Sequence, residues 1–290
     1  MISSLEQAAA GKSALAPAML AGMVVEVHDV AAARAFYEPI FGAAGEWQAG
    51  PNQLAFQAGR QRIEFVARAK PRSLSQTGQH QAYVVAADRL AAVTAELAAA
   101  GHSAERWRED HPAEREVSPY LLDPSDNRVQ LVPDRGAGLL LDHAAIEVHD
   151  LELAEIFYVS FLGGSVDYCH GWAMDDYAEA FAWGDGSDPC APWTRRYDVR
   201  YWDKVRIARP NMQLFVRFGP TVLAIVLATE HRQEPPPEQR TGTPRVVVAV
   251  DQPLARAEAE LSRLDVAFDR AGSSLFVRDL SGNFVELACR

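Results

Sequence analysis

Cysteine is scarce in this 290-residue chain, which has only Cys169, Cys190 and Cys289. The three are odd in number and do not form a Cys-x-x-Cys motif. This pattern indicates neither a disulfide framework nor a structural zinc knuckle. A chain without structural disulfides fits a reducing compartment, so we expect it in the cytoplasm.

Long apolar runs and an excess of basic residues are also missing. No stretch approaches the roughly 18 consecutive apolar residues of a membrane-spanning helix, so no membrane partner is expected. The 28 Lys and Arg residues are outnumbered by 39 Asp and Glu, which gives a formal net charge of -11. This charge argues against a nucleic acid partner, because binding to a phosphate backbone requires a basic surface.

Several common catalytic motifs are absent as well. The chain has no phosphate-binding Gly-x-x-x-x-Gly-Lys-Ser/Thr loop, no Gly-x-Ser-x-Gly elbow and no His-Glu-x-x-His zinc helix. Its 48% hydrophobic and 23% charged residues are typical of a folded, soluble chain. The composition therefore leaves a globular protein whose class must come from other patterns.

The chain does contain an internal repeat. Residues 22–30 (GMVVEVHDV) match residues 143–151 (HAAIEVHDL). The same register continues at three further pairs, Phe36 with Phe157, Tyr37 with Tyr158 and Gly42 with Gly163. β-Branched and small apolar residues at the start of each segment indicate a strand, and Asp29 and Asp150 are placed to cap a following helix. Each segment therefore predicts a strand, a helix and a glycine stop.

A second, weaker repeat lies between these segments. Residues 80–86 and 245–250 predict strands, and each is followed by apolar residues at helical spacing. Both segments close with a predicted hairpin, since YLLDPSDNRVQ at 120–130 corresponds to FVRDLSGNFVE at 276–286. The Asp, Ser, Gly and Asn residues in these hairpins are typical of tight turns.

The repeats predict four strand-helix-strand-strand-strand modules that start near residues 22, 80, 143 and 245. Polar, turn-rich linkers separate the modules and suggest two domains. The predicted parts are an N-terminal extension at 1–20, a first domain at 21–135 with modules at 21–68 and 79–133, and a second domain at 139–290 with modules at 141–230 and 244–290. The third module carries an aromatic-rich insertion at 168–209.

The repeated Val-His-Asp, Phe-Tyr and Phe-Gly or Leu-Gly sequences and the Asp-x-Ser-x-Asn-x-Val endings resemble the vicinal oxygen chelate superfamily. That superfamily includes glyoxalase I, extradiol dioxygenases, fosfomycin-resistance enzymes and bleomycin-binding proteins. The resemblance covers nearly the whole chain after residue 20. It implies an α+β fold in which four βαβββ modules pair into two glyoxalase/dioxygenase-like domains with half-open sheet cups. It is specific for the fold and less so for the reaction, because one fold hosts many chemistries.

In that superfamily, the metal ligands come from the first and last strands of each module. The matching positions in the first half of this chain are Gly22, Glu64, His80 and Gln130. Those in the second half are His143, Ala224, Arg245 and Glu286. The resemblance thus implies one candidate metal set of Glu64, His80 and Gln130 and another of His143 and Glu286. The ion would be Fe²⁺, Mn²⁺, Zn²⁺ or Ni²⁺, which accept imidazole and carboxylate ligands.

Residue 245 distinguishes the possible chemistries. The extradiol dioxygenase pattern would require a histidine there, and Arg cannot bind a metal ion because it stays protonated. His143 and Glu286 would then form a two-ligand site unless the insertion supplies a third group such as His170. Arg245 would instead bind a substrate carboxylate or enolate, next to Glu286 as its catalytic partner.

Other interpretations of these residues remain open. Glu64 and Gln130 are equally compatible with half-buried polar positions on a strand, His80 with an ordinary surface histidine, and His143 with a role other than metal binding. Aromatic residues of the insertion would either stack on a planar substrate or pack the insertion itself. The aromatic residues expected to bind substrate are Trp172, Trp183 and Trp202.

Two functions are compatible with the sequence. The first is an enzyme of the vicinal oxygen chelate type that acts on a small oxygen-bearing substrate through a divalent metal, as a lyase or isomerase or as a ring-cleaving dioxygenase. The alternative is a metal-free small-molecule binding protein of the bleomycin-resistance type, which the incomplete ligand sets favour. Either protein would bind a small molecule and would be a monomer or a homodimer.

Overall fold

The structure is a computed structural model. It describes residues 15, 17–72, 79–102, 118–134, 136, 138–170, 213–227 and 242–290. Residues 1–14 and most of the predicted insertion lie outside these ranges, and so do Trp172, Trp183 and Trp202.

All four predicted modules are present, each with an opening strand, a helix and later strands. The first comprises β1 (Pro17–Val27), α2 (Val30–Phe41), β2 (Glu46–Gly50), β3 (Gln53–Ala58) and β4 (Gln61–Ala67). The second comprises β5 (His80–Val85), α3 (Leu90–Ala99), β6 (Tyr120–Leu122) and β7 (Arg128–Pro133). The third comprises β8 (Leu141–Val148), α5 (Leu151–Glu155), η1 (Ile156–Phe161), β9 (Ser165–His170), β10 (Gln213–Phe218) and β11 (Thr221–Leu227). The fourth comprises β12 (Arg245–Val250), α9 (Leu254–Arg263), β13 (Asp269–Ala271), β14 (Ser274–Arg278) and β15 (Phe284–Cys289).

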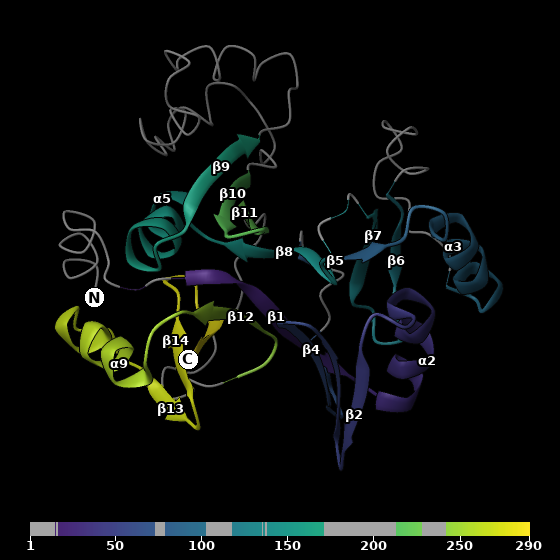
Figure 1. The fold of residues 1–290 in the computed structure, drawn as a ribbon, viewed down its shortest axis with the longest axis horizontal. Helices are drawn as coiled ribbons and strands as arrows, with labels where there is room; N and C mark the ends of the chain where they lie inside the picture. Colours follow the sequence, from purple (N-terminus) through teal and green to yellow (C-terminus); the bar gives the residue numbers. More distant parts are fainter. Residues whose placement is uncertain are drawn as a thin grey trace.

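The strands form two mixed sheets (Figure 1). The eight-stranded sheet has the order β13-β14-β15-β12-β1-β4-β3-β2, and the seven-stranded sheet has the order β6-β7-β5-β8-β11-β10-β9. In the middle of each sheet, the opening strands of two modules lie antiparallel to each other, β1 with β12 and β5 with β8. The first and fourth modules therefore share one sheet, and the second and third share the other.

This pairing confirms the fold class but corrects the expected grouping of modules. The sequence grouped modules 21–68 and 79–133 into one unit and modules 141–230 and 244–290 into another. The alternation of apolar residues determines which face of a strand is buried. It does not determine which opening strand lies against which free edge, because the backbone groups of every edge are alike. In the folded chain each sheet combines one module from each half.

Helix α2 begins and ends where its capping residues predict. Asp29 Oδ1 accepts hydrogen bonds from the backbone N–H groups of Ala31 and Ala32, at 2.6 and 3.2 Å, and α2 ends at Gly42, where φ is 54°. The third module differs, because α5 continues as a π-helical segment, η1, whose Phe157 and other aromatic residues stay buried. Among the described residues, no helix is long and apolar enough to cross a bilayer.

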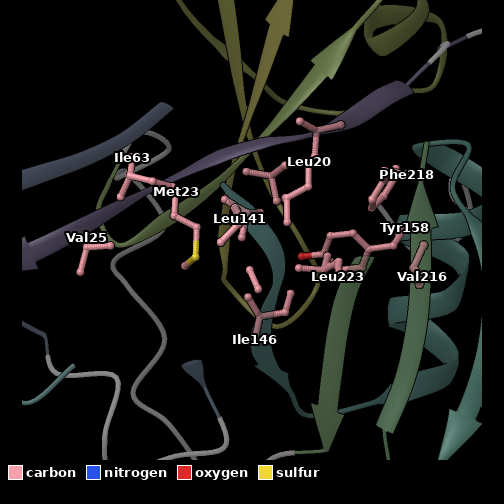
Figure 2. Close-up of a cluster of buried hydrophobic side chains, with 14 of the residues drawn as sticks. Leu20, Met23, Val25, Ile63, Leu141, Ile146, Tyr158, Val216, Phe218 and Leu223 are labelled. Atoms are coloured by element: carbon pink, nitrogen blue, oxygen red, sulfur yellow. The ribbon is translucent and has the colours of Figure 1, made fainter. Parts of the chain in front are cut away.

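The hydrophobic core lies between the two sheets. Figure 2 shows Leu20 and Met23 of β1 directed toward Leu141 and Ile146 of β8, and all four are buried. Gln61 adds a polar link across the same space, because its amide oxygen accepts from the Leu140 N–H at 2.7 Å and its Nε2 donates to the Leu141 carbonyl at 2.8 Å. A buried, fully bonded amide holds the two sheets in a fixed relation.

Consecutive modules are joined by the Asp-x-Ser-x-Asn turns. In the first half, Tyr37 OH of α2 donates to Asp123 Oδ2 at 3.0 Å, the His28 N–H donates to Ser125 Oγ at 2.9 Å, and Asn127 Nδ2 donates to a carbonyl of β1 at 3.0 Å. The turn of the second module therefore binds the strand-to-helix junction of the first. Each turn residue of this repeated motif satisfies a backbone or hydroxyl group that would otherwise be unpaired.

The second half repeats these contacts with the same chemistry. Tyr158 OH donates to Asp279 Oδ2 at 2.9 Å, the His149 N–H donates to Ser281 Oγ at 2.9 Å, and Asn283 Nδ2 donates to a carbonyl of β8 at 2.8 Å. Burial raises the pKa of the Asp279 carboxyl, and the hydrogen bonds that it accepts oppose the rise. Both halves thus have the same set of hydrogen bonds between the turn of one module and the strand-to-helix junction of the module before it.

Candidate functional site

Strand register gathers the predicted ligand positions into two groups, one on each sheet. On the seven-stranded sheet, Ala82 of β5 lies opposite His143 of β8 and beside Gln130 of β7, so these residues share one face. The group on this sheet consists of His80, Gln130, His143 and Ala224. The group on the eight-stranded sheet consists of Gly22, Glu64, Arg245 and Glu286.

The observed groups differ from the predicted ones. The sequence placed Glu64 with His80 and His143 with Glu286, but the members of each pair lie on different sheets. His80 and His143, which the sequence assigned to different halves, meet instead. The physical reason is the pairing of β5 with β8, which brings an opening strand from each half side by side.

His80 and His143 direct ring nitrogens at each other. Their Nε2 atoms are 3.1 Å apart, and their rings are nearly perpendicular, with an interplanar angle of 88° and centroids 5.2 Å apart. The ring of Tyr120 packs edge-on against His80 with a centroid distance of 5.3 Å. His80 is 7% exposed, so its ring is held by its surroundings rather than by solvent.

Asp142 orients the second imidazole. His143 Nδ1 lies 2.8 Å from Asp142 Oδ2. An ionised carboxylate only accepts hydrogen bonds, so in the neutral ring the proton lies on Nδ1 and the lone pair of Nε2 is directed toward His80. The same carboxylate–histidine pairing fixes the tautomer and raises the basicity of histidines that bind metals.

Gln130 directs an unbonded oxygen into the same face. Its Nε2 donates to Ser118 Oγ at 2.8 Å, and the Ser118 hydroxyl donates to the Leu131 carbonyl at 2.8 Å. Because the hydroxyl proton is already committed to Leu131, only the NH₂ end of the amide can face Ser118. Gln130 Oε1 is therefore fixed on the other side, where it is buried and has no hydrogen-bond partner among the described residues. We call His80, Gln130 and His143 the histidine cluster.

A divalent ion fits the histidine cluster in distance and in donor type. Two nitrogens bound to one ion at about 2.0–2.1 Å stand roughly 3.0–3.4 Å apart, and the two Nε2 atoms are 3.1 Å apart. Gln130 Oε1 is a buried acceptor that lacks a partner. Ala224, at the fourth position, contributes no donor atom, so the set has three neutral donors. In the part of the chain that the structure describes, no group of three or more His, Cys, Asp or Glu side chains is placed so that it could hold a metal ion.

An apolar patch continues the face that carries the histidine cluster. Ala145 lies opposite His80, and Ala224 lies beside Ala145. Val226 and Phe215 complete this small cluster, in which the three aliphatic residues are buried. A substrate at the cluster would thus contact apolar surface on one side, which limits the access of water.

The second group lines a cavity of about 250 Å³ on the eight-stranded sheet. Its charged lining includes Arg62, Glu64, Arg245 and Glu286, and its remaining lining is mostly small and apolar, for example Ala249. We call this cavity the arginine pocket. It contains the Glu64 and Glu286 carboxylates that the sequence assigned to metal sites.

Arg245 is held in place by several contacts. Its Nε donates to Glu286 Oε2 at 2.7 Å, and its Nη1 donates to the Gly242 carbonyl at 3.2 Å. Its guanidinium carbon lies over the Phe276 ring, 5.2 Å from the centroid. The other Glu286 oxygen accepts from Ser274 Oγ at 2.7 Å. The Arg245 and Glu286 side chains are only 17% and 15% exposed, so this pair is stronger than a surface ion pair.

A divalent ion does not fit the arginine pocket. Glu286 is already bonded to the Arg245 guanidinium, and Glu64 Oε2 lies 3.5 Å from Arg62 Nε. At Gly22, the position equivalent to His143, an added Cβ would lie 1.8 Å from the Arg62 carbonyl oxygen. No ligand-bearing side chain can therefore occupy that position, and both carboxylates have cationic partners in place of a metal.

Some predicted residues remain untested, and two supporting residues were missed. The three tryptophans of the insertion and the side chain of His170 lie outside the described residues. Asp142 and Ser118 were not predicted as parts of the site. The direct Asp142-His143 sequence was an available signal, whereas the contact of Ser118 with Gln130 depends on the β6–β7 hairpin.

Comparison with known proteins finds a family model that is similar to one part of the chain. The sequence model described as the Glyoxalase/Bleomycin resistance protein/Dioxygenase superfamily matches residues 20–131. A search of curated proteins found no match. Residues 20–131 contain β1 to β7, and therefore both the β5 and β7 members of the histidine cluster.

Solved structures with a similar fold cover almost the whole chain. Glyoxalase I from Zea mays superposes with a TM-score of 0.58 at 14% identity, covering 93% of this chain and 92% of that chain. A putative dioxygenase from Bacillus subtilis subsp. subtilis str. 168 superposes with a TM-score of 0.57 at 12% identity, covering 95% and 86%. At these identities the likeness concerns the fold alone.

Proposed function

From the match of residues 20–131 to the model of the Glyoxalase/Bleomycin resistance protein/Dioxygenase superfamily, we propose that the chain is a metal-dependent enzyme of the vicinal oxygen chelate type. His80, His143 and Gln130 hold the divalent ion. The substrate is a small organic molecule with adjacent oxygen atoms. The reaction is that of a lyase or isomerase, or the ring cleavage of a dioxygenase.

The observation that carries this proposal is the placement of three donor residues from three neighbouring strands on one face of the seven-stranded sheet. The two Nε2 atoms are 3.1 Å apart, and Gln130 Oε1 is buried without a hydrogen-bond partner in the described ranges. Leaving a buried acceptor unbonded costs about 1–3 kcal/mol. A cation bound at this point would satisfy the oxygen and relieve the close approach of the two imidazoles.

The ion would supply Lewis-acid polarisation of the substrate oxygens. The chain's own residues position and shield the reacting group. Asp142 fixes the His143 ring, and Ser118 holds the Gln130 amide. Ala145, Ala224 and the other residues of the apolar patch exclude water on one side. Because the three ligands are neutral, the site keeps a net positive charge when loaded and favours substrates that react as anions, such as an enolate or a catecholate.

Glu286 and Arg245 have no place in this site. The sequence assigned both to the chemistry of His143, but they line the arginine pocket on the other sheet. Stacking of Trp172, Trp183 or Trp202 on the substrate stays a prediction.

Calorimetric titration of chelator-treated protein with Zn²⁺, Mn²⁺, Ni²⁺ and, without oxygen, Fe²⁺ tests the proposal. We expect one ion per chain for at least one metal, and an affinity that falls about 100-fold or more in His80→Ala and His143→Ala. His28→Ala is the matched control, because His28 is exposed and contributes a backbone N–H bond to the fold. Absence of binding for all four metals, or binding that survives both substitutions, would contradict the proposal.

A metal-free binding protein is the second candidate. It is favoured by the lack of a ligating carboxylate in the histidine cluster, since among the described residues no group of three or more His, Cys, Asp or Glu side chains is placed to hold a metal ion. Aromatic side chains of the protein would then bind planar cations by stacking and cation–π contact. Thermal stabilisation by such cations that persists in EDTA would support this candidate. Stabilisation that requires added metal would refute it.

A further inference from the structure

The arginine pocket is a second, differently built cavity in the same chain. It lies on β1, β4, β12 and β15, where the opening and closing strands of the first and fourth modules run side by side. Its lining combines small side chains, such as Ala21, Val247 and Ala288, with charged groups. Small residues leave space above the sheet, and the charged groups surround that space.

The charged lining favours an anion. Four arginines and two glutamates line the cavity, and Asp251, which lies outside the lining, neutralises Arg60 at 3.0 Å, so the lining with this partner keeps one positive charge in excess. The chain as a whole is acidic, with a formal net charge of -11. A local group of guanidinium ions on an acidic protein is electrostatically selective for negatively charged ligands of small size.

Arg245 is arranged to donate to such an anion. Its Nε and Nη1 are bonded to Glu286 and Gly242, and Phe276 packs against its flat face. No hydrogen bond involving Nη2 is found in the described parts of the chain. A guanidinium that is fixed in advance loses little entropy when its remaining N–H groups bind an anion.

The same surroundings limit the charge and the size of the ligand. Glu64 and Glu286 line the cavity, so a dianion would be repelled more strongly than a monoanion. The volume of about 250 Å³ is below the roughly 300–1,000 Å³ of pockets for drug-sized molecules. The small apolar residues suit a hydrocarbon or aromatic body attached to the anionic group.

We propose that the arginine pocket binds small organic monocarboxylates without a metal, with the ligand carboxylate bonded to Arg245 and its apolar body on the small residues of β1, β12 and β15. Arg245 provides here the positive charge that the divalent ion provides in the histidine cluster. The site is independent of the proposed catalytic site, because it lies on the other sheet and uses none of the same residues.

Calorimetric titration of the chelator-treated full chain with benzoate tests this proposal. We expect saturable binding of one benzoate per chain, no binding of the neutral analogue benzamide, and weaker binding of inorganic phosphate. Arg245→Gln should weaken benzoate binding roughly tenfold or more, because a hydrogen bond to a charged group is lost. Arg34→Gln, on the exposed face of α2, is the matched control and should have no effect.

Measurements of metal binding and benzoate binding in a further variant distinguish this proposal from that of the catalytic site. His143→Ala should abolish metal binding and leave benzoate binding unchanged. The proposal is overturned if benzoate does not saturate below about 10 mM, if benzamide or phosphate binds as well as benzoate, or if His143→Ala rather than Arg245→Gln removes benzoate binding. Where Arg245→Gln does not fold, the comparison of benzoate with benzamide on the natural chain decides the question.

Discussion

The histidine cluster and the arginine pocket occupy equivalent places in two sheets of the same construction. In each sheet, two opening strands run antiparallel in the middle and the closing strands lie beside them. One place contains two imidazoles and an unbonded amide oxygen. The other contains carboxylates that are already paired with guanidinium groups.

The difference shows that the repeated strand pattern supplies the positions but not the chemistry. Positions 143 and 22 are equivalent in the repeat, yet one holds a ring nitrogen and the other has no space for a Cβ. A set of neutral donors attracts a cation, whereas an ion pair with spare N–H groups attracts an anion. The same backbone thus supports two opposite electrostatic preferences.

The largest effect is expected when the arginine pocket receives a metal-binding side chain. This change would remove the difference in cation binding between the two places. Arg245→His places an imidazole beside Glu64 and Glu286, and two carboxylates with one imidazole form a suitable divalent site. We expect the variant to bind a second ion, with an affinity of about 10 µM or tighter, as measured by native mass spectrometry. Arg245→Gln, which removes the guanidinium without adding a ligand nitrogen, should still bind a single ion. Equal stoichiometry in the two variants would contradict the comparison.

A smaller effect is expected on stability. Gly22→Ala forces a Cβ to within 1.8 Å of the Arg62 carbonyl oxygen, so the free energy of unfolding should fall by about 3 kcal/mol. The control is Gly59→Ala, where φ is 54° but an added Cβ meets nothing within 4 Å. Backbone strain alone should cost about 1–2 kcal/mol there. Equal losses in urea denaturation would show that β1 tolerates a side chain at position 22.

The support of the histidine cluster gives a third prediction. Asp142→Asn replaces an acceptor by an amide that can donate to Nδ1 of His143, which moves the ring proton to Nε2. We expect metal affinity to fall about 10–100-fold with little change in stability, and Asp142→Glu to recover part of it. Glu38→Gln, in an exposed pair on α2, is the control. Unchanged affinity in Asp142→Asn would remove Asp142 from the site.

The smallest effect on stability is expected from the tyrosine–aspartate hydrogen bonds that both halves share, Tyr37 with Asp123 and Tyr158 with Asp279. Tyr158→Phe removes a donor to the Asp279 carboxylate, which should cost about 1.5 kcal/mol at neutral pH. Tyr37→Phe should cost more, since Tyr37 OH also accepts from Gln81 Nε2. Differential scanning calorimetry of the two variants measures both losses. Equal losses would mean that the Gln81 contact contributes nothing.

The Tyr158→Phe loss should also depend on pH. Burial raises the folded-state pKa of Asp279 above its ordinary value of 3.8, so the folded chain holds this proton more tightly than the unfolded chain. The contribution of Asp279 to the free energy of unfolding therefore rises as the pH falls through the folded-state pKa toward 3.8. Since Tyr158 stabilises the ionised form, the deficit of the variant should shrink over the same range. A constant deficit would contradict this assignment.

Local features of the sequence predicted much of the fold. The strand-helix-glycine repeat predicted β1, β8 and the helices that follow them. This was possible because helix capping and hydrophobic periodicity depend on residues only a few positions apart in the sequence. The module pairing was not predictable, since it depends on which strand edges meet over long sequence separations. The pairing of modules also determines which candidate residues meet. His80 and His143 were therefore identified as metal-binding candidates, but each was assigned to a different set of ligands.

The central claim is that the two equivalent places differ in cation binding. Anomalous X-ray diffraction from crystals of the Zn²⁺-loaded chain, collected at the zinc absorption edge, tests it directly. The account predicts one peak, within bonding distance of the Nε2 atoms of His80 and His143 and of Gln130 Oε1. A peak between Glu64 and Glu286, or no peak at the two histidines, would contradict it.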